Sequence, residues 1–124
     1  MGIWANHIYV IPPNADLFIQ GNFFKVTSPR IKRNKQIDVF FTSLAEAMGK
    51  RAIGIILSGY DGDGTEGCKQ IKAKGGVTFA QDDSAEVNKM SLSAQATECV
   101  DFVLSPKKIA EELVKIGKKW RKYV

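Results

Sequence analysis

Two aspartates in a glycine-rich turn are the residues of this chain best placed to carry out chemistry. The apolar run 52–57 predicts a buried strand, and it ends in the turn SGYDGDGTEG (58–67), which contains Asp61 and Asp63. A stretch compatible with a helix follows at 65–74. In α/β proteins, ligands and reacting groups lie outside the carboxyl ends of parallel strands, in loops of this kind. We therefore expect one of the two carboxylates to belong to a functional site.

The segments around this turn alternate between strand and helix patterns. The other expected strands are 7–11, 77–81 and 100–104, together with a small hairpin formed by 17–19 and 23–26. The expected helices are 37–48, with Asp38 in its first turn, 65–74 and 106–124, and a polar loop at 82–93 leads into a helical turn at 94–98. Alternating strands and helices indicate parallel βαβ units with right-handed crossovers. The predicted fold class is α/β, with a doubly wound, mostly parallel sheet in three α/β/α layers and no internal domain boundary in residues 1–124.

The 124 residues fit one domain, and the net charge of +5 comes entirely from the end of the chain. Residues 106–124 hold seven Lys or Arg against two Glu, which leaves equal numbers of basic and acidic residues in 1–105. A body without a basic excess argues against nucleic-acid binding. The same terminal segment predicts an amphipathic helix, whose lysines lie opposite one apolar stripe: Ile109, Leu113, Ile116 and Trp120.

The sequence also indicates the compartment in which we expect the chain to function. Its first residues show no basic region followed by an apolar stretch, so no secretory signal is visible. It has no apolar run near the roughly 18 residues that a membrane span needs. Cys68 and Cys99 lie far apart and form no CxxC motif. We expect both to be buried, reduced thiols of a cytoplasmic protein.

The glycine-rich turn matches a dinucleotide-binding fingerprint in its spacing. Gly62, Gly64 and Gly67 stand as GxGxxG between a predicted strand and a predicted helix, and Asp82 follows at about the distance of a ribose ligand. Two carboxylates beside the loop would repel the pyrophosphate that such a loop attracts. A nucleotide site is therefore a weaker interpretation, and Asp82 fits a loop cap at a strand end better.

Two further interpretations use the aspartates themselves. The series Asp61, Asp63 and Thr65 has the spacing of a calcium loop, but Glu66 stands where that loop needs Gly and Lys72 where it needs Glu. In the other interpretation, one aspartate is the acid that orients a histidine in a hydrolytic triad.

Four ordered blocks of the sequence carry a resemblance that favours the triad. They are HIYVIPPN (7–14), IDVFFTSLAEAMGKRAIGIILSGYDGDGTEG (37–67), IKAKGGVTFAQD (71–82) and SAQATECVDFVLSPKKIAEEL (93–113). Together they resemble the carboxyl-terminal half of the catalytic domain of the chemotaxis protein-glutamate methylesterases, the CheB-type family. The IPPN and ILSG segments are similar to the variant in which the esterase is fused to a receptor methyltransferase.

The resemblance implies a Ser-His-Asp hydrolase without metal or cofactor. Such enzymes remove methyl esters from glutamates in the cytoplasmic domains of chemoreceptors, and often deamidate receptor glutamines. The family's catalytic acid falls on Asp63, which would orient the imidazole and stabilise the imidazolium. Asp61 has no family role and is expected to be a solvated loop acid. The backbone N–H of Tyr60 corresponds to an oxyanion donor, for which the side chain is immaterial.

The resemblance also implies that this chain lacks the other two triad members. The family's serine and histidine precede its HIYV-like strand, where this chain begins. His7 belongs to that strand and is expected to be a packing residue, and Ser58 lies in no GxSxG elbow and has no base. We therefore expect the isolated chain to be inactive. The rival interpretation is a non-enzymatic docking module or degenerate paralogue.

Two features of the sequence bear on the partners that this chain could bind. The family carries Gly-Met-Pro-Arg-Ser-Ala where this chain has KMSLSA (89–94), and the lost arginine removes a forked donor for peptide binding. A sheet without its upstream strands also exposes an edge, through which we expect self-association.

Overall fold

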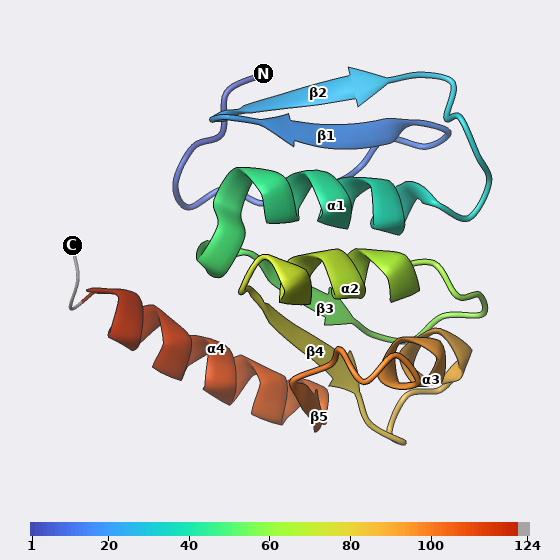
Figure 1. The fold of residues 1–124 in the computed structure, drawn as a ribbon, viewed down its shortest axis with the longest axis vertical. Helices are drawn as coiled ribbons and strands as arrows, with labels where there is room; N and C mark the ends of the chain where they lie inside the picture. Colours follow the sequence, from blue (N-terminus) through green and yellow to red (C-terminus); the bar gives the residue numbers. More distant parts are fainter. Residues whose placement is uncertain (122–124) are drawn as a thin grey trace.

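A parallel three-stranded sheet and a separate hairpin frame the glycine-rich turn in the computed structural model, which describes residues 1–121 (Figure 1). The parallel sheet has the order β3-β4-β5, with bounds Ile53–Ile56, Val77–Gln81 and Phe102–Leu104. The antiparallel hairpin consists of β1 (Asp16–Gln20) and β2 (Phe23–Thr27). The predicted hairpin and the strands at 52–57, 77–81 and 100–104 are thus confirmed.

In the described part of the chain, four α-helices pack around these strands, and they place the chain in the α/β class. Their bounds are α1 Gln36–Met48, α2 Thr65–Ala73, α3 Lys89–Gln95 and α4 Pro106–Arg121, with one 3₁₀ turn, η1, at Gly49–Arg51. Among residues 1–121, no helix combines the length and apolar content that crossing a bilayer requires.

Helices cover both faces of the parallel sheet. On one face, Gly54 of β3 lies against Phe41 of α1 and Ile71 of α2. On the other face, Val77 and Phe102 line a common space with α4. The hairpin packs against the far side of α1, so that hairpin, α1, α2, sheet and α4 follow one another across Figure 1. The predicted arrangement of helices on both faces of a parallel sheet is confirmed.

Phe41 of α1 joins the two parts of the core. It packs against one cluster of buried residues, Ala45, Ala52 and Ile71, and against a second, Ile56, Cys68 and Ala94. This packing requires α1 to approach α2 closely at Gly67, where an added Cβ would lie 2.5 Å from the Cβ of Phe41. The residue at 67 therefore sets the distance between the two helices.

Cys68 lies fully buried in this core, as expected, whereas Cys99 is half-buried. Burial, together with the neighbouring Asp38 carboxylate and Cys99, raises the pKa of the Cys68 thiol to about 12. A thiol of such high pKa stays protonated at neutral pH, so Cys68 acts as a packing residue.

The terminal helix has the predicted amphipathic character over its described part. Ile109 is buried, while Leu113, Ile116 and Trp120 are half-buried on the same stripe. The guanidinium of Arg51 lies 5.3 Å from the centre of the Trp120 ring, in a cation–π contact. Residues 122–124 of the predicted helix lie outside the described residues.

The predicted strand at 7–11 is wrong. This segment forms no regular element, and the side chains of Ile8 and Val10 are 94% and 86% exposed. A strand requires a ladder partner, and no described residue pairs with residues 7–11. The apolar alternation of a strand is present, but the described residues provide no strand that pairs with it.

The predicted polar loop at 82–93 ends earlier than expected. Helix α3 begins at Lys89 and contains the whole KMSLSA block. Its residues Ser91 and Ala94 are buried, and Met90 packs against the second core cluster. A few apolar residues at helical spacing are thus enough to form a helix here, because they pack against an apolar surface.

We predict opposite effects of alanine at two helical glycines. Gly67→Ala forces Phe41 to move and should lower the free energy of unfolding by about 1–3 kcal/mol. Gly117→Ala is the matched control, because an added Cβ meets nothing within 4 Å there, and should stabilise by about 0.5–1 kcal/mol. Urea denaturation of both variants measures the difference, and equal effects would contradict the close approach of α1 and α2.

Candidate functional site

The carboxylate of Asp63 is buried at the carboxyl end of β3 and is held by the first turn of α1. Asp63 is only 5% exposed. Oδ2 accepts a hydrogen bond from the backbone N–H of Ile37 at 2.9 Å, and Oδ1 accepts one from the N–H of Asp38 at 2.8 Å. Both oxygens are therefore fixed by backbone donors that belong to another element.

Helix α1 needs this carboxylate because it has no cap of its own. The residue at its N-cap, Lys35, carries no side-chain acceptor and makes no capping hydrogen bond. The N–H groups of the first turn then require an acceptor from elsewhere. An anion is favourable at this position, where the helix dipole is positive.

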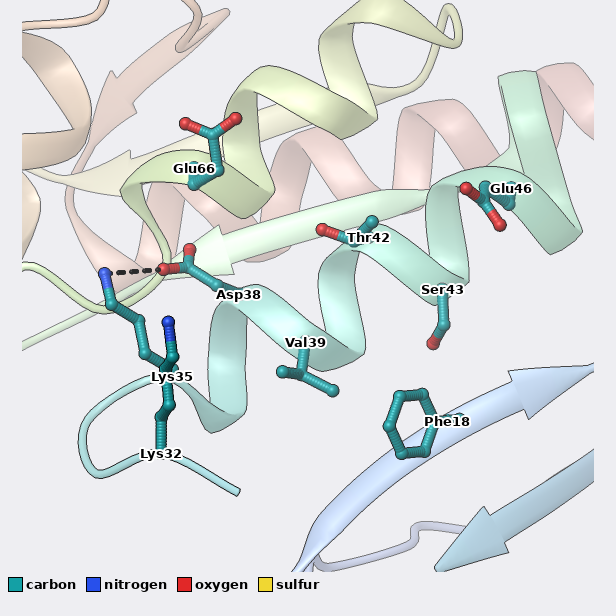
Figure 2. A pocket seen from close by; sticks show the side chains of 9 residues that line it. All are labelled: Phe18, Lys32, Lys35, Asp38, Val39, Thr42, Ser43, Glu46 and Glu66. Carbon is teal, nitrogen blue, oxygen red and sulfur yellow. Dashed lines mark ion pairs between the residues drawn. The ribbon is translucent and has the colours of Figure 1, made fainter. Parts of the chain in front are cut away.

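Asp38 caps the start of helix α2 in the same way. Its Oδ1 accepts hydrogen bonds from the N–H of Gly64 at 2.9 Å and of Gly67 at 2.8 Å. Its Oδ2 lies 3.6 Å from the ammonium of Lys35, as Figure 2 shows. Asp63 therefore caps α1, which contains Asp38, and Asp38 caps α2, which begins directly after Asp63 and Gly64. We call the two residues the reciprocal caps.

The turn before α2 is shaped to hold Asp63 in this position. Gly64 has a φ of 97°, in the left-handed region, and an added Cβ would lie 2.5 Å from Cδ1 of Ile56. Asp61 accepts a hydrogen bond from the N–H of Asp63 at 2.8 Å. The expectation that Asp61 is merely a solvated acid is wrong, because its carboxylate supports the turn.

Tyr60 lies one step before these acids, at the surface. Its side chain is 79% exposed, and its backbone N–H has no hydrogen-bond acceptor within residues 1–121. The Gly59 N–H donates to the Val87 carbonyl, and the Gly59 carbonyl, which shares a peptide unit with the Tyr60 N–H, accepts from the Met90 N–H. The Tyr60 N–H is thus a donor without an acceptor in residues 1–121, on a peptide that is held through its carbonyl.

His7 and Ser58 take part in other interactions. Nδ1 of His7 lies 2.7 Å from the carbonyl oxygen of Ala5, and the ring stacks on Tyr9. The Ser58 hydroxyl donates to the Val87 carbonyl and accepts from the Val87 N–H. Neither side chain hydrogen-bonds to Asp63 in the described part of the chain.

The nucleotide interpretation loses its main support in this geometry. The N–H groups of Gly64 and Gly67, which would face a phosphate, already donate to Asp38. Asp82 accepts a hydrogen bond from the Ser84 N–H at 3.0 Å, and the hydrogen bonds from Ser84 lower the pKa of Asp82. Asp82 therefore caps its own turn, as the sequence favoured.

A groove of about 550 Å³ runs beside the reciprocal caps, between α1 and the hairpin. Figure 2 shows Phe18 on β1 opposite Val39 of α1, with Lys32 and Lys35 extending side by side near Asp38. Thr42, Ser43, Glu46 and Glu66 complete the lining. The groove places apolar surface and two ammonium groups next to the buried acids.

The sequence reasoning placed Asp38 only as a favourable charge in a first turn and missed its contact with the turn before α2. One signal could have indicated it. Helix α1 begins after Lys35 instead of after Ser, Thr, Asp or Asn, so its cap had to come from a distant residue.

We predict that amide substitutions of the two reciprocal caps differ in their effect on stability. Asn at 63 places an NH₂ group against one of two N–H donors, so Asp63→Asn should lower the free energy of unfolding by about 1–3 kcal/mol. Asn at 38 keeps one oxygen for both Gly64 and Gly67, so Asp38→Asn should cost less than about 1 kcal/mol. Chemical denaturation measures both, and the reverse order would contradict the hydrogen-bond pattern.

Comparisons with known proteins place this arrangement in a family. The family model for CheB methylesterase matches residues 1–113. A putative protein-glutamate methylesterase/protein-glutamine glutaminase of Leptospira interrogans is 38% identical over 118 residues, which cover 92% of this chain and 61% of that protein. The corresponding protein of Methanococcus maripaludis is 34% identical over 122 residues, or 92% of this chain and 33% of its own length.

A solved structure of the same family has a similar fold. The crystal structure of the Thermotoga maritima CheB methylesterase catalytic domain superposes with a TM-score of 0.76 at 29% identity, covering 85% of this chain and 59% of that domain. The chain thus spans less than two thirds of these relatives. It belongs to the CheB methylesterase family.

Proposed function

We propose that this chain forms part of a protein-glutamate methylesterase in which Asp63 is the acid of a Ser-His-Asp triad. The substrates are glutamyl methyl esters, and glutamine amides, in the cytoplasmic domains of chemoreceptors, and the site of action is the cytoplasm. The single observation that carries the proposal is a buried carboxylate, fixed by two backbone donors at the carboxyl end of a parallel strand. The names of the relatives support the activity.

Asp63 has the acceptor capacity that this role requires. An ionised carboxylate offers about four lone-pair positions, and the N–H groups of Ile37 and Asp38 use one on each oxygen. A further position is left for the Nδ1–H of an imidazole. The acid would fix the tautomer of the histidine and stabilise the imidazolium while the serine attacks the ester carbonyl.

The proposal gives the backbone of Tyr60 the role of oxyanion donor. Its N–H has no acceptor within the described residues, and it lies three residues before Asp63 on the same turn. A donor of this kind stabilises the negative charge that develops on the carbonyl oxygen of the tetrahedral intermediate. The serine and the histidine come, in this proposal, from the part of the relatives that this chain does not cover.

We predict that the isolated 124-residue chain releases no methanol from a peptide bearing a glutamate γ-methyl ester. A hydroxyl without a base is a poor nucleophile, and the Ser58 hydroxyl is hydrogen-bonded to Val87. Methanol release over hours at neutral pH is the measurement. Enzymatic turnover that disappears in Ser58→Ala or His7→Ala would disprove this part of the proposal.

A hybrid enzyme tests Asp63 directly. The part of the Thermotoga maritima catalytic domain that this chain does not cover is joined to the chain, and the hybrid should hydrolyse the methyl ester. Asp63→Asn should lower its kcat about 10³–10⁴-fold, because the histidine loses its orienting acid.

Asp83→Asn is the matched control for this hybrid, because it removes one negative charge from an exposed loop residue. It should leave kcat unchanged. A folded, active hybrid in which Asp63→Asn retains full activity would overturn the assignment of the acid.

We also propose that the outer edge of β3 mediates self-association of the chain. Strand β3 pairs only with β4 within the described residues, and Leu57 at its end is 47% exposed. Sedimentation velocity should show a dimer that Leu57→Lys weakens, whereas the hybrid, whose added strands cover this edge, should be monomeric. A monomer at high concentration of the isolated chain would contradict the proposal.

A further inference from the structure

We infer that Asp38 is a positioning residue, which holds the carboxylate of Asp63 in the geometry that the proposed triad requires. The inference rests on the proposed function of Asp63 and deepens it. Asp38 contributes to the acid in two ways: its backbone N–H donates to Asp63 Oδ1, and its side chain binds the turn that follows Asp63. Asp38 thus holds both the carboxylate of Asp63 and the turn that follows it.

The turn has little rigidity of its own. Three of the six residues from 59 to 64 are glycines, which have the largest backbone freedom. Gly64, directly after Asp63, is buried, and its N–H has Asp38 as its acceptor. Without the Asp38 carboxylate, the buried N–H groups of Gly64 and Gly67 lose their acceptor, and the turn must move to satisfy them.

Such a movement would reach Asp63 directly, because Gly64 is its neighbour in the chain. A displacement of about 1 Å in a catalytic group costs on the order of 10²-fold in rate. Asp61 also supports the turn through the Asp63 N–H, but it belongs to the same loop and moves with it. Asp38, unlike Asp61, holds this loop from a different, well-packed helix.

The position of the Asp38 oxygen, and not its charge, carries this role. A single oxygen, Oδ1, accepts both backbone hydrogen bonds. Among residues 1–121, the other oxygen has Lys35 as its only partner. The Lys35 side chain is 54% exposed, and ion pairs open to solvent contribute little. Asn at position 38 should therefore replace Asp, whereas Ala should not.

Amide hydrogen exchange in the 124-residue chain tests this inference without catalysis. Asp38→Ala should speed exchange of the Ile37 amide, which donates to Asp63, by about tenfold or more relative to the amides of β4. Asp38→Asn should not. Lys35→Met is the control, because it removes only the exposed ammonium. If exchange speeds up at Gly64 and Gly67 alone, Asp38 caps α2 without positioning Asp63, and the inference is wrong.

The hybrid enzyme provides the catalytic measurement. Asp38→Ala should lower kcat about 10–100-fold with KM within about twofold of its original value, and Asp38→Asn should restore kcat. Unchanged kcat in Asp38→Ala would overturn the inference while leaving the proposed function intact. Full activity of Asp63→Asn would instead overturn the proposed function.

A second pair of variants decides the matter if Asp38→Ala does not fold. Asp38→Glu keeps the charge and moves the oxygens by one methylene, whereas Asp38→Asn removes the charge and keeps their position. The inference requires Asn to retain kcat and slow exchange at Ile37 and Glu to lose both. The opposite result would show that charge matters and position does not, and would refute it.

Discussion

The exchange of two carboxylates between two helix N-termini is the interaction on which this structure depends. Helices α1 and α2 both begin without a side-chain cap from their own N-cap residue, and each takes an aspartate from the start of the other. Four backbone donors and two anions are satisfied at one place, within the protein interior. Unlike an ordinary cap, this arrangement is tertiary: neither helix start is complete until both helices are in position.

The reciprocal caps make the geometry of the site depend on the packing of the core. Asp38 reaches Gly64 only because α1 lies directly on α2, and Gly67 permits that approach by offering no side chain to Phe41. Gly54 of β3 likewise leaves room for Phe41 and Ile71 beneath the helices. A change in any of these contacts would therefore alter the distance between the two acids.

What the sequence predicted and what it missed follow from the range of the interactions involved. Strand β3 and helices α1 and α2 were predictable because their patterns are local, and the proposed role of Asp63 came from the family motif. The strand at 7–11 failed because pairing depends on a partner, which no local pattern reports. Helix α3 was hidden by polar residues and forms because Met90 meets an apolar surface, and the link from Asp38 to Gly64 spans 26 residues.

The double hydrogen bonding of Asp63 has a consequence for how an active site of this kind could assemble. Both oxygens are fixed by Ile37 and Asp38 within this chain, so the acid adopts one orientation before any histidine is present. Immobilising a flexible side chain on association costs about 0.5–1.5 kcal/mol, and here folding has already met that cost. A histidine brought by another polypeptide segment would meet a rigid acceptor. Under the proposed function, the chain would supply this acid already preorganised, as one part of a split enzyme does.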